Sequence, residues 1–158
     1  MLDHGDAAPD FELATDGEDT VRLSALKGQP VVLFFYPKDD TPGCTAEAKD
    51  FSSLDSGFLE AGAEIIGISP DSVASHCKFK KLHGLTVTLA GDIDKKTANA
   101  YGVWVEKSMY GKKYMGVDRS TFLIDRDGIV AKAWRSVKVP GHVDEVLDAA
   151  RLVGATNG

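Results

Sequence analysis

The chain has 158 residues, and its 18 basic and 24 acidic side chains give a formal net charge of −6. With 43% hydrophobic and 27% charged residues, it is expected to fold as one soluble domain, residues 1–158, around a single core. The acidic balance disfavours a nucleic-acid partner, and the longest strongly apolar run, residues 31–35, is far below the ~18 residues of a membrane span, so no membrane partner is expected.

The N-terminal part of the chain contains a predicted hairpin and a predicted central strand. The opening, MLDHGDAAPDFEL, lacks the basic start and apolar middle of a signal peptide, which predicts a cytoplasmic protein. Short apolar stretches at residues 11–13 and 21–23 flank a turn-rich segment, 15–19, and predict a small β-hairpin. Residues 30–36, PVVLFFY, form a continuous β-branched and aromatic run, which predicts a strand covered on both faces.

The middle of the chain alternates predicted helices with predicted strands. Helical spacing of apolar residues supports the first helix, and capping residues bound the second. The elements are, in order, a helix carrying Ala48, Phe51, Leu54 and Phe58 and ending near Gly62, a strand at 64–69, a helix from Asp71 or Ser72 to about His83 closed by Gly84, a strand at 86–90 and a helix at 94–101.

The C-terminal part predicts a second hairpin and a closing helix. Its elements are strands at residues 119–125 and 129–134, their connecting turn at 125–128, and a helix from about His142 to Val153 with Gly154 as its stop. The element order matches an α/β thioredoxin-like fold, a central mixed β-sheet flanked by helices with an N-terminal β-hairpin. In open α/β sheets, sites lie beyond the carboxyl ends of the strands, which directs attention to residues 37–44.

Cys44 and Cys77 are the only cysteines in the sequence. Two thiols are too few for a disulfide framework or an all-thiolate zinc site, and the four histidines show no metal-ligand spacing with them. We therefore expect no structural zinc site. We expect the histidines at the surface or at helix ends, and none beside Cys44, as a Cys–His hydrolase would require.

The local sequence predicts an unusual position for Cys44. Thr41 is suited to the N-cap of a helix and Pro42 to its first residue, which makes Cys44 the third helical residue. Unpaired backbone N–H groups and the positive end of the helix dipole favour an anion there, so we expect a thiolate. The alternative is a small buried residue that packs the first helical turn.

A wider motif surrounds Cys44. Pro37, Thr41 and Cys44 follow the apolar strand in the order P-x-x-x-T-x-x-C, which resembles the active-site motif of the peroxiredoxins. The stretch YPKDDTPGCTAEA, residues 36–48, resembles the PrxQ or bacterioferritin-comigratory subfamily of thiol peroxidases. The resemblance covers essentially the whole chain, through residues 71–84, 109–116, 119–125 and 133–142.

The resemblance implies a role for each residue of the motif. Cys44 would be the peroxidatic nucleophile, which attacks a hydroperoxide and becomes a sulfenic acid. Thr41 would hydrogen-bond the peroxide and the thiolate, and Pro37 would shield the pocket. Arg119 would stabilise the thiolate and the leaving oxygen, and Glu47 would orient Arg119 through an ion pair. The alternatives are a solvated charge for Glu47 and a surface strand residue for Arg119.

The second thiol leaves more than one possibility open. Many members of the subfamily have a resolving cysteine five residues after the peroxidatic one, where this chain has Lys49, so regeneration must use Cys77 or an external thiol. Another arrangement in the subfamily places the resolving cysteine in the following helix, where Cys77 lies. Cys77 points away from Phe79 and Leu82 on a helical wheel, which predicts an accessible thiol. We expect the Cys44 helix to unwind locally when a Cys44–Cys77 disulfide forms.

The resemblance implies a thiol peroxidase that reduces hydrogen peroxide or organic hydroperoxides without metal or haem. Thioredoxin would be its reductant, and the protein would be a monomer. Two alternatives remain: a one-cysteine peroxidase recycled by an external thiol, and a thioredoxin-fold redox sensor or binding module that reacts only slowly with peroxide.

Overall fold

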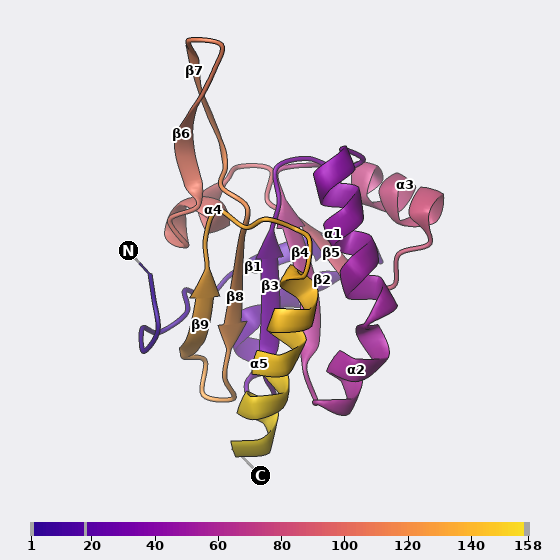
Figure 1. The fold of residues 1–158 in the computed structure, drawn as a ribbon, viewed down its shortest axis with the longest axis vertical. Helices are drawn as coiled ribbons and strands as arrows, with labels where there is room; N and C mark the ends of the chain where they lie inside the picture. Colours follow the sequence, from indigo (N-terminus) through magenta and orange to yellow (C-terminus); the bar gives the residue numbers. More distant parts are fainter. Residues whose placement is uncertain (1, 18, 157–158) are drawn as a thin grey trace.

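The computed structural model in Figure 1 describes residues 2–17 and 19–156. The strands of its main sheet are β1 (Glu12–Thr15), β2 (Thr20–Arg22), β3 (Val31–Phe35), β4 (Glu64–Ser69), β5 (Thr88–Gly91), β8 (Ser120–Ile124) and β9 (Val130–Trp134). They form one mixed sheet in the order β2-β1-β5-β4-β3-β8-β9. The predicted N-terminal hairpin is confirmed as β1 and β2, at one edge of this sheet.

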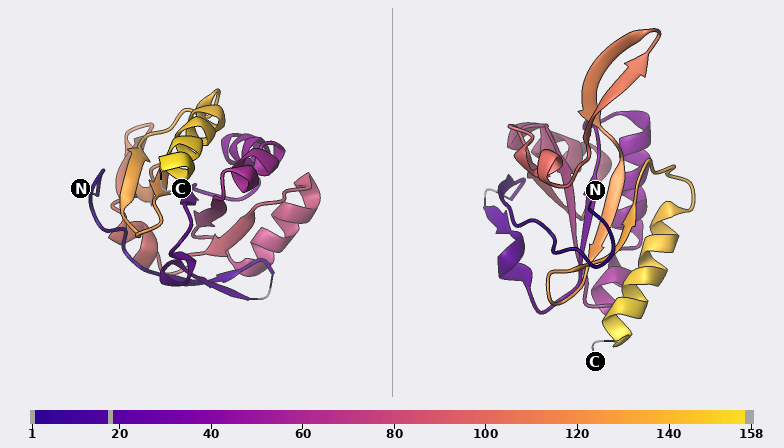
Figure 2. Two further views of the ribbon diagram at one scale, coloured as in Figure 1. Left: turned by 90° about the horizontal axis from the view of Figure 1, so that it is seen from below. Right: turned by 90° about the vertical axis from the view of Figure 1, so that its left-hand side faces the viewer.

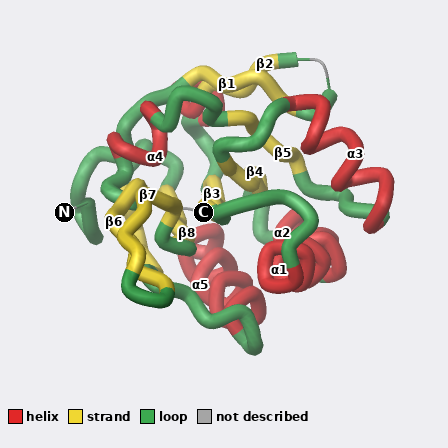
Figure 3. Tube along the Cα trace, turned by 90° about the horizontal axis from the view of Figure 1, so that it is seen from above, coloured by secondary structure: helices red, strands yellow, loops and turns green. Residues whose placement is uncertain are grey.

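Helices cover both faces of the sheet (Figure 2, Figure 3). One face carries α1 (Pro42–Ser53), α2 (Asp55–Glu60), α3 (Val73–His83) and α5 (His142–Thr156), and the other carries α4 (Lys96–Ala100), the 3-10 helix η1 (Leu23–Leu26) and the N-terminal segment. The predicted thioredoxin-like α/β fold, a mixed sheet flanked by helices, is confirmed. Among the residues that the structure describes, none of the helices combines the length and apolar character that crossing a bilayer requires.

The strand β3 lies inside the sheet and is buried along its whole length. It pairs in parallel with β4 and antiparallel with β8. Val32 and Phe34 face the core under α1, α3 and α5, while Val31, Leu33 and Phe35 face the second core, under α4. The alternation confirms the predicted strand covered on both faces. The loop to α1 begins at the carboxyl end of β3.

The helix predicted to run on to Gly62 is interrupted at Leu54, where α1 ends and α2 begins. The interruption falls in the stretch SSLDSG, whose serine, aspartate and glycine residues are poor helix formers. Thr86 also holds the two sides of the break, because its N–H donates to Ser52 Oγ at 3.0 Å and its hydroxyl to Asp55 Oδ2 at 3.0 Å. The prediction of a single helix is therefore wrong.

Gly154 does not stop the last helix, because α5 continues to Thr156. Gly154 is not among the glycines with a positive φ, so it does not form a left-handed helix end. A Cβ atom on Gly154 would lie only 2.6 Å from the carbonyl oxygen of Ala61. The glycine thus lets α5 pack closely against the turn after α2, and the predicted role as a stop is wrong.

A further hairpin, which consists of β6 (Trp104–Met109) and β7 (Lys112–Val117), projects from the body of the protein (Figure 1). Its strands pair with each other and with no other described strand. The turn places Tyr110 and Gly111 at positive φ, and the Tyr110 side chain is 99% exposed. No element was predicted for this region, because a hairpin without a buried face lacks the alternation of apolar and polar residues that indicates a strand.

Close packing around Gly67 in β4 gives a prediction for stability. A Cβ atom on Gly67 would lie 2.5 Å from Cζ of Phe34, a ring that is fully buried and stacks on Phe51 at 4.5 Å. Because that ring has no space to move, Gly67→Ala is expected to lower the free energy of unfolding by about 1–3 kcal/mol, measured by urea titration. Gly17→Ala is the control, since its nearest neighbour would lie 3.9 Å away, and an equal loss in both variants would contradict the packing argument.

Candidate active site

Cys44 lies in the first turn of α1, directly beyond the carboxyl end of β3. Thr41 has the extended backbone of an N-cap residue, Pro42 is the first helical residue, and Thr45 N–H donates to the Thr41 carbonyl at 2.8 Å. The side chain of Cys44, the third helical residue, is 1% exposed and packs in the core beneath α1. The predicted position of Cys44 is confirmed, and it brings a buried sulfur to the positive end of a helix.

The side chain of Thr41 does not cap the helix, contrary to the expectation. Its hydroxyl instead donates to the carbonyl oxygen of Lys38 at 2.9 Å, within the loop between β3 and α1. The first N–H groups of α1 therefore donate no hydrogen bond to this side chain. Pro37 lies half-buried at the start of the same loop.

Arg119 connects Cys44 with Glu47. Its Nη2 donates to Cys44 Sγ at 3.1 Å, and its Nη1 to Glu47 Oε1 at 2.7 Å. Arg119 directly precedes β8, whose first residue, Ser120, pairs with Phe35 at the end of β3. Gly43 also contributes, although no pattern in the sequence indicated it, because a Cβ atom there would lie 3.2 Å from Arg119 Nη2. Glycine at this position therefore leaves space for the guanidinium group.

Glu47 is a buried ion-pair partner. Its side chain is fully buried and that of Arg119 is 16% exposed, so the alternatives of a solvated charge and a surface strand residue are both wrong. Burial raises the pKa of Glu47 to about 7, because the desolvation of its carboxylate outweighs the stabilising charge of Arg119. At neutral pH the carboxyl group is thus divided between its charged and neutral forms.

Cys77 lies on α3, apart from the Cys44 cluster. Its thiol donates to the Asp16 carbonyl oxygen at 3.1 Å, and Lys80 Nζ lies 2.7 Å from Asp16 Oδ2. The thiol is half-buried against the β1–β2 turn, whereas we expected it to be accessible. Leu82, which the helical wheel places with Phe79 on the apolar side of the helix, is exposed while Phe79 is buried. Both cysteines are free thiols in this structure.

Comparison with known proteins gives this geometry a context. A model of a protein family described as AhpC/TSA matches residues 4–133. The chain belongs to the AhpC/TSA family. A relative in Bacillus subtilis, peroxiredoxin Bcp, is 51% identical over 150 residues, which cover 95% of this chain and 96% of the relative.

Solved structures of similar proteins agree with this assignment. A variant of PrxQ from Xylella fastidiosa has a TM-score of 0.91 at 38% identity, covering 96% of this chain and 97% of that one. A structure of Xanthomonas campestris bacterioferritin comigratory protein, studied for its alkyl peroxide reduction activity, has a TM-score of 0.87 at 44% identity, covering 91% and 92%. Within the AhpC/TSA family, the chain is therefore a peroxiredoxin of the Bcp/PrxQ type, a thiol-dependent peroxidase.

This peroxiredoxin also contains a buried polar cluster that the sequence did not indicate. His76, expected at the surface, is fully buried, and its Nδ1 lies 2.8 Å from Asp39 Oδ2. Tyr36 donates to Asp39 Oδ1 at 2.6 Å. Burial raises the pKa of Asp39, but the hydrogen bonds from His76 and Tyr36 outweigh this effect and lower it. His142 is also buried, at the start of α5, where its Nε2 lies 2.8 Å from Thr121 Oγ1.

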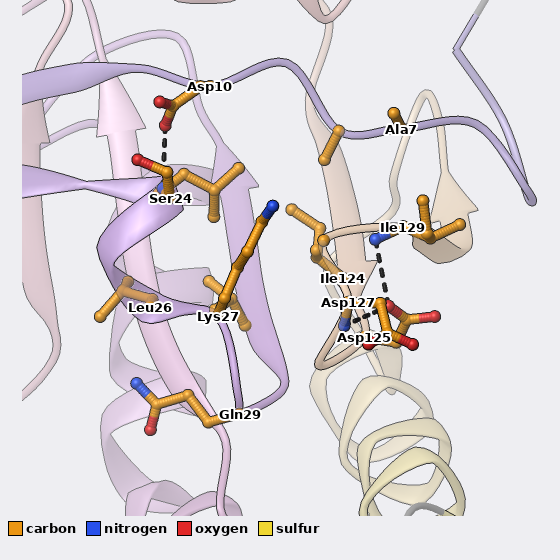
Figure 4. Close-up of a pocket in the computed structure, with 14 residues that line it drawn as sticks. Ala7, Asp10, Ser24, Leu26, Lys27, Gln29, Ile124, Asp125, Asp127 and Ile129 are labelled. Carbon is orange, nitrogen blue, oxygen red and sulfur yellow. Dashed lines mark hydrogen bonds between the residues drawn. The ribbon is translucent and has the colours of Figure 1, made fainter.

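A hollow of about 410 Å³ lies at the opposite end of the sheet, beside the first residue of β3 and the last of β8 (Figure 4). At its wall, Asp10 accepts from the backbone N–H of Ser24 in η1, and Asp125 accepts from backbone N–H groups of the turn between β8 and β9, as the dashed lines in Figure 4 show. Neither cysteine lines this hollow, so it is separate from the Cys44 site. Within residues 2–17 and 19–156, no cluster of three or more histidine, cysteine or acidic side chains is arranged to hold a metal ion.

Proposed function

We propose that Cys44 is the peroxidatic residue of this peroxidase and that its thiolate attacks one oxygen of hydrogen peroxide or an organic hydroperoxide. A sulfur–oxygen bond forms as the O–O bond breaks, and the second oxygen leaves as water or an alcohol after taking up a proton. The sulfur is oxidised by two electrons to a sulfenic acid, and the peroxide is reduced by two electrons. The observation that carries this proposal is the 3.1 Å contact from Arg119 Nη2 to the buried Cys44 sulfur.

The surrounding groups then have defined tasks. Arg119, held by Glu47 at 2.7 Å, stabilises the thiolate and the charge that develops on the leaving oxygen. The first N–H groups of α1 and the Thr41 hydroxyl, which must turn from Lys38, supply further donors to the two peroxide oxygens. Pro37 limits the access of water to the pocket. These tasks rest on the arrangement of fixed donors around one sulfur atom.

Cys77 completes the proposed cycle. Its thiol attacks the Cys44 sulfenic acid, a disulfide forms, and the hydroxyl group leaves as water with the thiol proton. A dithiol protein, thioredoxin by family resemblance, then reduces the disulfide and returns both thiols. The separation of the two cysteines, with Cys77 bonded to Asp16, keeps the one-cysteine cycle with an external thiol as a second candidate.

Peptide mapping after a single oxidation tests the cycle. The reduced protein is mixed with one equivalent of hydrogen peroxide and digested without reductant, for the wild type and for Cys77→Ser. We expect a Cys44–Cys77 peptide in the wild type and a Cys44 sulfenic acid that accumulates in the variant. Fast Cys44 oxidation without a bridge would replace the two-cysteine cycle by the one-cysteine cycle. Oxidation no faster than that of free cysteine would favour the slow redox sensor and overturn the role of Cys44.

The remaining elements of the proposal concern assembly and location. We propose that the 158 residues act as one domain, as a monomer and in the cytoplasm, with a hydroperoxide as substrate. The family resemblance supports the monomer. Sedimentation of the reduced and oxidised protein measures the assembly state directly.

A further inference from the structure

The two cysteines are held on separate supports. Arg119, next to Cys44, directly precedes β8, and Asp16, next to Cys77, directly follows β1. In the sheet order, β8 and β1 are separated by four strand spacings of ~4.8 Å, which amounts to roughly 20 Å. A disulfide requires Cα atoms within ~7 Å of each other. The two thiols are free in this structure and are held by different contacts, so a bridge between them requires a movement of α1 or α3. Figure 3 shows α1 and α3 as separate helices.

A first contact ties the loop before α1 to helix α3. The carboxylate of Asp39, in this loop, lies 2.8 Å from His76 Nδ1 and accepts from Ser75 Oγ at 2.7 Å, and both partners belong to α3. The backbone N–H of Asp39 donates to Asp71 Oδ2 at 2.7 Å, just before α3. Tyr36, at the end of β3, donates to the other carboxylate oxygen. Asp39 is thus bonded to helix α3, to Asp71 just before it, and to Tyr36 next to the end of β3.

Because this first contact is buried, breaking only one part of it is unfavourable. His76 is fully buried, and its Nε2 lies 3.0 Å from the carbonyl oxygen of Ala90. The two ring nitrogens thus lie on a carboxylate of the loop on one side and on a backbone carbonyl of the sheet on the other. If the loop moved while His76 stayed in place, a buried polar ring would lose its partner, which is strongly unfavourable. The loop and α3 therefore tend to release together.

A second contact lies one residue further along the loop. Asp40 Oδ1 lies 2.7 Å from Nε2 of His83, the last residue of α3. His76 and His83 are seven residues apart, so they lie on one face of the helix. Asp40 has a φ of 59°, in the left-handed region that is uncommon for residues other than glycine. It directly precedes Thr41, the N-cap of the Cys44 helix.

We propose that the pairs Asp39–His76 and Asp40–His83 form a clasp that holds the Cys44 loop on helix α3 and limits the rate at which Cys44 and Cys77 come together. The inference rests on the proposed two-cysteine cycle. While the clasp is closed, Cys44 stays beside Arg119, as the attack on peroxide requires. When it opens, the loop and α3 separate, and the left-handed backbone of Asp40 is free to relax. The four residues are positioning residues, since none of them touches the reacting sulfur.

The test separates the two steps of the cycle. In His83→Gln, where the clasp residue is partly exposed, disulfide formation from the sulfenic acid is expected to be about fivefold faster than in the wild type. The yield of sulfinic acid under excess peroxide should fall in parallel. Cys44 oxidation should be unchanged or slower, measured in the Cys77→Ser background. A general loss of stability also favours opening of the loop, so the clasp is identified by a variant pair that restores the contact and with it the wild-type rate.

Matched variants complete the experiment. Lys81→Gln removes a charge from the exposed face of the same helix and should leave both rates unchanged. Asp40→His alone should accelerate disulfide formation, because it removes the contact to His83. Combining Asp40→His with His83→Asp restores an Asp–His pair and should return the rate of disulfide formation to that of the wild type, because histidine tolerates the left-handed region. His76→Gln, if it folds, should accelerate the second step more than His83→Gln.

Two results would overturn the proposal, and they are distinguishable. Disulfide formation within twofold of the wild type in His83→Gln and in Asp40→His, with normal Cys44 oxidation, overturns the clasp and leaves the two-cysteine cycle intact. A wild type that oxidises Cys44 without forming a bridge overturns the cycle and the clasp together.

Discussion

Replacing Arg119 with Met is expected to slow the oxidation of Cys44 by ~10²–10³-fold, the usual effect of removing a fixed donor at a developing charge. Met has a similar length and no donor, so it removes the 3.1 Å contact to the sulfur without opening a large cavity. Rapid mixing of the reduced protein with hydrogen peroxide at neutral pH measures the rate. The oxidation rate of Arg119→Lys should lie between those of the wild type and Arg119→Met, because an ammonium group keeps the charge but cannot make the two-armed contact to Cys44 and Glu47.

A double variant separates this chemical effect from loss of structure. Arg119→Met leaves Glu47 buried without its ion-pair partner, so the single variant is also expected to lose stability. Adding Glu47→Gln removes the buried acid and should restore stability, but the oxidation rate should stay low. A double variant that oxidises Cys44 at the wild-type rate would show that Arg119 acts only by holding the fold.

The pH dependence of stability should carry a contribution from Glu47. Burial raises the pKa of Glu47 to about 7 from its ordinary value of 4.5. Between these values the unfolded chain has released the proton and the folded protein still binds it, so stability decreases as pH rises. The decrease from this group is on the order of 3 kcal/mol, from 1.36 kcal/mol per unit of pKa difference, and it is complete above about pH 7.

Urea unfolding of the wild type and of Glu47→Gln at several pH values isolates this contribution. The variant lacks the titrating group. Its free energy of unfolding minus that of the wild type should therefore increase as pH rises from about 4.5 to 7. Other carboxyl groups titrate equally in both proteins and cancel in the difference. A difference that stays constant over this range would show that Glu47 is ionised in the folded protein well below pH 7.

Much of the fold could be predicted because its central elements have strong local patterns. The apolar run of β3 and the turn-rich N-terminal hairpin are readable from a few residues each. The continuation of α5 past Gly154 could not be predicted, because it depends on the distant carbonyl group of Ala61, and the break at Leu54 adds contacts from the distant Thr86 to its local poor helix formers. Such contacts are not visible in a local stretch of sequence.

The site divides in the same way. The position of Cys44 in the first turn of α1 follows from three neighbouring residues, so the sequence alone predicts it. The contact with Arg119 crosses 75 residues of sequence, and only the family resemblance indicated it. The Asp39–His76 contact crosses 37 residues, and neither the spacing nor the resemblance pointed to it. The half-buried state of Cys77 depends on Asp16, in the distant β1–β2 turn.

The projecting β6–β7 hairpin has a consequence for association between molecules. Each strand pairs only with the other among the described strands, so their outer edges present open backbone donors and acceptors on which another strand could be added. Lys107 on β6, and Lys112 and Lys113 on β7, place positive charges along this ribbon. Two such ribbons repel each other when they approach, and this discourages aggregation through strand addition. The lysines therefore oppose aggregation of a segment whose exposed methionine and tyrosine side chains would otherwise favour aggregation.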